Sequence, residues 1–149
     1  MAPDTVIIPI SDDLVAHADW LAASEQLHRQ LRPDLPSAYA DYMRQMFAEG
    51  AEMAVAAEGD KVRAVAVYHA RLTTFHGRRF YIDDLVADEA ERSRGFGGQL
   101  LDWCEVRARE RGCAALDLES GVQRQRAHRF YFRRNLVIHT LGFTKDLTI

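Results

Sequence analysis

The sequence lacks long apolar runs, is poor in cysteine and carries no excess of positive charge. No stretch reaches the ~18 consecutive apolar residues that a membrane-spanning helix requires. Cys104 and Cys113 are the only cysteines, and without a Cys-x-x-Cys or histidine spacing they predict no metal site. The 19 basic and 22 acidic residues give a net charge of −3, which argues against binding to a nucleic-acid backbone. Membrane proteins, zinc proteins and nucleic-acid binders are therefore not expected.

Residues 1–10 also lack the charged start and long apolar run of a signal peptide, so we expect a cytoplasmic protein. What is present is the composition of a globular domain, with 48% apolar and 28% charged residues. The length of 149 residues suits a single domain, 1–149, that is large enough to bury a proper core.

The first half of the chain is typical of two helices followed by an antiparallel meander. Ser11-Asp12-Asp13 predicts a helix start after a short strand at 6–10, and Ser37 predicts the cap of a second helix. The second helix carries an apolar stripe that suits either a core or the wall of an acceptor pocket: Tyr39, Tyr42, Met43, Met46 and Phe47. Three strands of the meander are predicted at 51–57, 62–72 and 80–86.

The second half changes to alternating helices and strands. A helix is predicted at 97–111 and a strand at 114–119, so 80–86 and 114–119 become parallel neighbours joined by a crossover helix. Further elements complete the chain: a short helix at 125–134 and strand-like segments at 136–141 and 142–148. The fold class is therefore α/β, with a mixed central sheet that begins as an antiparallel meander.

The most informative stretch lies between the third strand of the meander and the next helix: Arg92-Ser93-Arg94-Gly95-Phe96-Gly97-Gly98. The first N–H groups of a helix have no partner inside it and point outward with the positive end of the dipole. Glycines let the backbone approach a ligand and adopt positive φ, while Arg92 and Arg94 add positive charge. Such a turn suits an anion, and a diphosphate fits it.

Three alternatives use similar residues. A dinucleotide fold requires Gly-x-Gly-x-x-Gly, but Leu100 stands at the third glycine position. A P-loop requires Gly-Lys-Ser/Thr, but Gln99 follows Gly98. The third alternative is a plain strand-to-helix turn, which a glycine pattern alone does not exclude.

The wider pattern is more specific. Arg-x-x-Gly-x-Gly is followed by Leu100-Leu101, by a predicted strand, and then by Ala127-His128-Arg129-Phe130-Tyr131. From about residue 80 to 143 the chain resembles the GCN5-related N-acetyltransferase (GNAT) family, in which Gln/Arg-x-x-Gly-x-Gly/Ala holds the acetyl-CoA pyrophosphate. Two positions depart from the family pattern. Arg124 stands where asparagine is frequent, and Gly142-Phe143 lies eleven residues beyond Tyr131 instead of about three.

The resemblance implies a site for acetyl-CoA. The pyrophosphate would bind the backbone N–H groups of Arg92, Ser93, Arg94, Gly95, Phe96, Gly97 and Gly98, with the Phe96 ring packing inward. The pantetheine arm would pair like an added strand with Leu85, Val86 and Ala87. No metal is expected to take part.

The family also carries a tyrosine near the CoA sulfur, and Tyr131 matches it. A phenol has an ordinary pKa of about 10, and a thiol has a pKa of roughly 8.5. A phenol is therefore a reasonable proton donor to the departing thiolate. Consecutive acids in a strand point to opposite faces, and a carboxylate is costly to bury unpaired, so at least one of Asp83 and Asp84 is expected to line a water-filled cleft. The resemblance implies which one: Asp83 takes the place of a family acid that is sometimes assigned as the base, so it is the candidate base. Asp84 and Glu119 are the alternatives. His128 could relay a proton, but we expect it to be exposed.

The predicted function is transfer of an acetyl group from acetyl-CoA to an amine, by direct attack in a ternary complex. The alternative is a non-catalytic module that binds acyl-CoA as a sensor or for assembly, and a nucleotide-binding oxidoreductase is a weaker third hypothesis. Asp83, Asp84 and Glu119 together would favour a cationic small-molecule or peptide acceptor. The tail after Tyr131 could pair strands across a homodimer.

Overall fold

The computed structural model describes residues 4–148; residues 1–3 and 149, which the expected domain 1–149 includes, lie outside the described part. The chain packs as two compact units, the first ending at Asp117 and the second beginning at Leu118. The helices and strands follow one another in this order: β1 (Thr5–Pro9), α1 (Ala18–Leu31), α2 (Tyr39–Ala48), β2 (Glu52–Glu58), β3 (Lys61–Leu72), β4 (Arg78–Ala87), α3 (Phe96–Glu110), β5 (Ala115–Leu118) and α4 (Gln125–Arg133).

The five strands form one sheet whose spatial order follows the sequence, β1-β2-β3-β4-β5. The pairs β1–β2, β2–β3 and β3–β4 are antiparallel, as the predicted meander requires. The sheet is mixed, because β5 follows the crossover helix α3 and runs parallel to β4. The predicted α/β fold with a mixed central sheet is confirmed.

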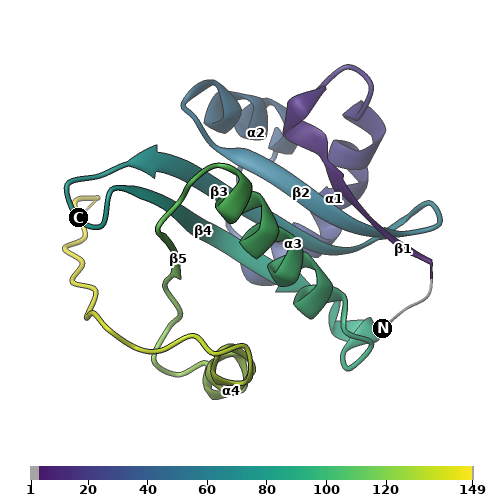
Figure 1. Cartoon of the computed structure of the whole chain (residues 1–149). Coiled ribbons are helices and arrows are strands. Elements are labelled where there is room, and N and C mark those ends of the chain that lie inside the picture. The colour runs from purple at the N-terminus through teal and green to yellow at the C-terminus, as the bar shows by residue number, and fades with distance from the viewer. Residues whose placement is uncertain (1–3, 149) are drawn as a thin grey trace. The chain divides into compact units, whose positions relative to one another are not determined.

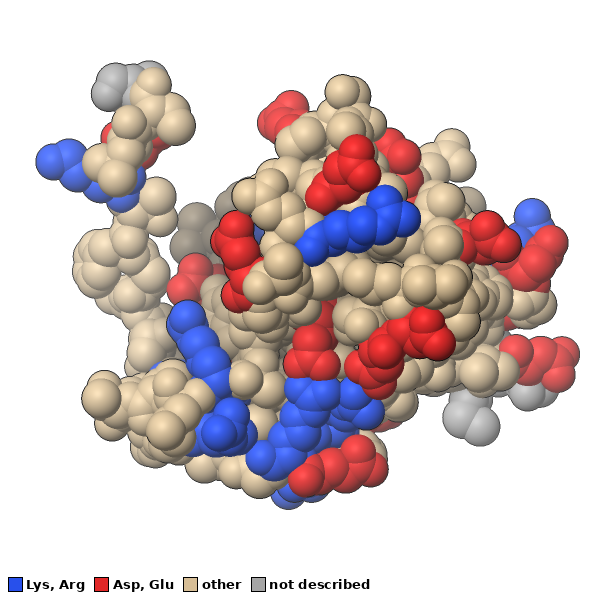
Figure 2. Space-filling model, turned by 90° about the horizontal axis from the view of Figure 1, so that it is seen from above, with Lys and Arg blue, Asp and Glu red and all other residues tan. Residues whose placement is uncertain are grey.

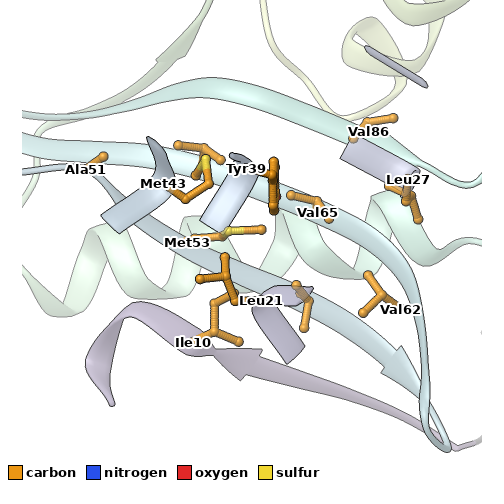
Figure 3. Close-up of a cluster of buried hydrophobic side chains, with 12 residues drawn as sticks. Ile10, Leu21, Leu27, Tyr39, Met43, Ala51, Met53, Val62, Val65 and Val86 are labelled. Atoms are coloured by element: carbon orange, nitrogen blue, oxygen red, sulfur yellow. The ribbon is translucent and has the colours of Figure 1, made fainter. Parts of the chain in front are cut away.

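Helices cover both faces of this sheet in the first unit, with α3 on one face and α1 and α2 on the other (Figure 1). The α1/α2 side holds the hydrophobic cluster of Figure 3, in which Leu21, Met43 and Met53 are at most 1% exposed. On the α3 side, Tyr68 stacks on Phe80 at a ring-centroid distance of 4.5 Å. Since burial of one large apolar side chain contributes about 1.5–3 kcal/mol, both layers stabilise the middle of β3 and β4.

The first two helices begin differently from the sequence prediction. After a 3-10 helix at Ile10–Asp12, the Asp13 carboxylate accepts from two backbone N–H groups, and α1 itself begins only at Ala18. Ser37 was expected to cap α2, but the N-cap is Ala38, which makes no side-chain hydrogen bond. None of the helices within residues 4–148 combines the length and apolar character needed to cross a membrane.

The second unit contains α4 and an extended tail. Among the described residues after α4, none lies in a helix or strand, so the strands predicted at 136–141 and 142–148 are wrong. A strand requires a neighbour for its backbone hydrogen bonds, and the apolar residues that suggested these strands do not supply one. Asn135 ends α4 at φ 63°, a left-handed conformation that asparagine adopts more readily than most residues.

Candidate active site

The turn between β4 and α3 has the conformation of an anion site. Gly95 precedes α3 at φ 86°, in the left-handed region that costs most other residues roughly 1–2 kcal/mol. Because Gly95 has no side chain to cap the helix, the first N–H groups of α3 have no acceptor in the helix or at its N-cap. Together with the helix dipole, these groups favour a phosphate at this end of α3.

The first two residues of α3 differ in what fixes them. The Phe96 side chain is 2% exposed and packs inward, as the sequence predicted. A Cβ added to Gly97 would lie 3.5 Å from the Ala87 Cβ, which is an ordinary contact distance. Packing inside the protein therefore does not require glycine at 97, whereas a ligand close to the backbone would.

Carboxylates neutralise the arginines of this turn. Arg94 donates to Glu58 of β2 and also, at 2.7 Å, to Glu91, and the bond from Arg94 lowers the pKa of Glu58. Arg92 Nη2 lies 3.3 Å from Glu89. On the face seen in Figure 2, the largest group of basic side chains is likewise flanked by acidic ones. Arg92 and Arg94 were expected to add positive charge, but their pairing leaves the N–H groups as the main source of positive potential.

β5 pairs with only part of the outer edge of β4. It has four residues against ten in β4, and the N–H of Ala114 donates to the Arg78 carbonyl at 2.8 Å, at the start of β4. Arg79 and Asp117 join the same ends of the two strands through a 2.6 Å ion pair. Because parallel strands advance together by about 3.3 Å per residue, β5 ends opposite the middle of β4. Residues 85–87 run beyond it, along an edge that suits an extended amide chain.

A β-bulge interrupts β4 at Asp83. Tyr68 of β3 pairs with Ile82 while Val67 pairs with Asp84, so Asp83 is an extra residue on its strand. The expectation that Asp83 and Asp84 point to opposite faces is wrong. The bulge breaks the alternation, and residues on the α1/α2 side of the sheet bind both carboxylates.

The Asp84 carboxylate belongs to a buried network. Its Oδ2 accepts from His28 Nε2 at 2.7 Å, and its Oδ1 accepts from Arg32 Nε at 2.8 Å. His28 is 1% exposed, and its Nδ1 accepts from the Tyr39 hydroxyl at 2.8 Å. Burial alone raises the pKa of Asp84, but the hydrogen bonds from His28 and Arg32 outweigh burial and hold this pKa below its ordinary value. Asp84 is therefore a structural anion and a poor candidate for a base.

The Asp83 carboxylate has a single histidine partner. Its Oδ2 lies 2.6 Å from His69 Nδ1, and both side chains are 29% exposed. Burial raises the pKa of Asp83, and the hydrogen bond from His69 reverses only part of that shift. On β3, His69 alternates with Tyr68 and so shares the face of Val67, a core residue of the α1/α2 side. The candidate base is thus one half of an accessible imidazole–carboxylate pair.

The remaining predicted residues lie in the second unit. Tyr131 is on α4; burial raises the pKa of its phenol and the Arg124 guanidinium lowers it by less, so the phenol is protonated at neutral pH. His128 was expected to be exposed, but it is partly buried and its Nε2 donates to the Gly121 carbonyl at 2.8 Å. Glu119 is exposed.

Sequence reasoning missed His28, His69 and Arg32. Helical spacing places His28 seven residues after Leu21 on the buried face of α1, so its burial could have been predicted. Arg32 gives no such signal, because its partner Asp84 lies 52 residues further along the chain. Among residues 4–148, no three histidine, cysteine, aspartate or glutamate side chains gather as metal ligands do.

Comparison with known proteins assigns the chain to a family. A family model for the acetyltransferase (GNAT) family matches residues 17–136. The chain belongs to this family. An uncharacterized N-acetyltransferase, YhdJ, of Bacillus subtilis (strain 168) is 37% identical over 87 residues, which are 58% of this chain and 57% of that protein. The aminoalkylphosphonate N-acetyltransferase of Salmonella typhimurium is 38% identical over 66 residues, 44% of this chain and 43% of that protein.

The GNAT fold extends to solved structures. An aminoglycoside acetyltransferase from an uncultured soil metagenomic sample superimposes with a TM-score of 0.79 at 15% identity, over 99% of both chains. In sequence, however, the chain spans only about half the length of the curated relatives it matches. GNAT proteins use acetyl-CoA and act on amine acceptors, so the family and the names of these relatives support an acetyltransferase.

Proposed function

We propose that this protein transfers the acetyl group of acetyl-CoA to a primary amine of a small molecule or peptide, by direct attack in a ternary complex. The observation that carries the proposal is the turn at Gly95. A left-handed glycine and an uncapped helix start stand together where the family holds a pyrophosphate.

The proposed roles follow the order of the reaction. The pyrophosphate binds the N–H groups of residues 92–98, and the pantetheine arm pairs with the open edge at residues 85–87. An acceptor that arrives as an ammonium first loses one proton to solvent. The neutral amine nitrogen then attacks the thioester carbon, and the C–S bond breaks. Tyr131, a phenol that its raised pKa keeps protonated, gives a proton to the thiolate, and the match to Ala-x-x-Phe-Tyr supports this role.

The acceptor proposed here is a cationic amine in its resting form. The Salmonella relative is named for an aminoalkylphosphonate, a compound class that carries an amine. Fewer carboxylates are available to attract a cationic acceptor than the sequence predicted, because His28 and Arg32 already bind the Asp84 carboxylate. In the first unit, attraction of a cation therefore rests on Asp83.

Thiol release from acetyl-CoA, measured against a panel of primary amines, tests this function. We expect amine-dependent release that saturates with acetyl-CoA, and Tyr131→Phe should lower kcat with little change in CoA affinity. Gly97→Asp should abolish CoA binding, because a carboxylate repels the pyrophosphate and blocks its approach. CoA binding without release for any amine would instead favour a non-catalytic acyl-CoA-binding module.

A further inference from the structure

The His69–Asp83 pair stands apart from the other histidine interactions of the molecule. Within residues 4–148, the bond to Asp83 is the only hydrogen bond of the His69 side chain. His28 uses both ring nitrogens and is 1% exposed, so no substrate proton can reach it. His128 commits its Nε2 to the Gly121 carbonyl. Among these three, only His69 is oriented by a carboxylate while it keeps partial exposure and an uncommitted ring nitrogen.

The pairing fixes which nitrogen is uncommitted. An ionised carboxylate only accepts hydrogen bonds, so Asp83 Oδ2 selects the tautomer of His69 that carries its proton on Nδ1. The lone pair of Nε2 then remains available, as in other imidazoles that a carboxylate orients. Imidazole is also the side chain whose ordinary titration falls nearest neutral pH, which suits a base that must accept and release a proton in each cycle.

The pair also lies at a special point of β4. Asp83 is the bulged residue, and bulges commonly re-aim a side chain next to an active site. Arg32 Nη2 donates to the Asp83 carbonyl at 3.3 Å and so ties the bulge to α1. Two residues on, about 7 Å along the strand, begins the edge proposed for the pantetheine arm. The thioester end of that arm would therefore lie near the bulge.

We propose that His69 is the general base of the acetyl transfer and that Asp83 is a positioning residue that orients it. The inference rests on the proposed function and names the base of that same site. The amine N–H proton passes to His69 Nε2 as the N–C bond forms and the C–S bond breaks. The thiolate takes its proton from Tyr131. The Tyr131 phenolate regains a proton from solvent and His69 returns its proton to solvent, so no further reactant is needed.

Two substitutions separate a base from a structural residue. His69→Asn keeps an N–H that can donate to Asp83 but has no counterpart of Nε2. His69→Ala removes both and leaves space for added imidazole. We expect kcat to fall about 100-fold or more in both variants, with the acetyl-CoA KM unchanged, and imidazole to restore activity to His69→Ala in proportion to its concentration. Asp83→Asn should lower kcat less than either.

His17→Asn is the matched control, because His17 precedes α1 and asparagine is favoured at such N-cap positions. It should leave kcat unchanged. Wild-type kcat in His69→Asn, with CoA affinity showing that the variant folds, would overturn the assignment of His69 and leave the proposed function standing. Absence of amine-dependent thiol release in the wild type would overturn the proposed function itself.

Discussion

Asp83 and Asp84 are neighbours in sequence, yet they lie in two different environments of the same sheet. Asp84 is 11% exposed and accepts hydrogen bonds from two side chains, the buried His28 ring and the Arg32 guanidinium. Asp83 is 29% exposed and has one partner. Their pKa values accordingly move in opposite directions, down for Asp84 and up for Asp83. The comparison teaches that the donors around a carboxylate, and its access to water, separate a structural anion from one that solvent can reach.

The comparison is tested most strongly by deleting each carboxylate. Asp84→Ala should lower the free energy of unfolding by about 2–4 kcal/mol, because it leaves the Nε2–H of His28 buried without an acceptor and also removes the bond from Arg32. Asp83→Ala removes a more exposed pair and should cost less than about 1 kcal/mol. Urea denaturation of both variants measures the difference, and equal losses would contradict the distinction between the two carboxylates.

The pH dependence of stability should separate the two carboxylates by sign. The lowered pKa of Asp84 contributes stability above the ordinary value of 3.8, and this is lost as pH falls through the folded-state pKa. The raised pKa of Asp83 does the reverse, so stability falls as pH rises from 3.8 through the folded-state pKa. A pKa that differs by one between the folded and the unfolded chain corresponds to about 1.4 kcal/mol of stability.

Urea denaturation at pH values from about 3 to 7 reads out both effects. The stability gap between wild type and Asp84→Asn should narrow toward low pH. Asp83→Asn should gain on wild type as pH rises. Parallel pH profiles for the two variants would be inconsistent with the opposite pKa directions.

A smaller effect is expected at the far end of the Asp84 network. Tyr39→Phe removes the hydroxyl that donates to His28 Nδ1 and leaves that nitrogen buried and unpaired, at a cost of about 1–3 kcal/mol. Tyr42→Phe is the control on the same helix, since Tyr42 is 39% exposed, and it should change stability little. Thermal or urea unfolding of the two variants compares them directly.

The smallest effect is expected at Arg32, which joins the two environments. Its guanidinium bonds the Asp84 carboxylate and the Asp83 carbonyl, but the side chain is 53% exposed. Arg32→Gln should therefore cost only about 0.5–1 kcal/mol, and less in high salt. Unfolding at low and high ionic strength checks this; a salt-independent loss of several kcal/mol would mean that Arg32 acts as a buried partner.

Local patterns explain which parts of the fold were predictable. The meander, the crossover helix and the turn at Gly95 follow from alternation, helical spacing and glycine placement, all of which act over a few residues. The tail after Tyr131 was not predictable in this way. Its apolar residues satisfy a strand pattern, but a strand exists only where another segment accepts its hydrogen bonds.

The site shows the same limit more sharply. The residues before Asp83 contain no glycine that would signal a bulge. The sequence therefore predicted simple alternation, with the two acids on opposite faces of the sheet. The partners of these acids, His69 and His28, lie 14 and 56 residues away from them in sequence. Such pairings depend on how the sheet and α1 pack against each other. The spacing of residues along the sequence does not predict that packing.

The glycine turn is tested most directly by titrating the isotopically labelled protein with CoA and following the backbone amides by NMR. We predict that the amide signals of Phe96, Gly97 and Gly98 shift and saturate at the same CoA concentration as binding itself. Saturable binding that leaves these three amides unchanged would contradict the claim that the glycine turn holds the pyrophosphate.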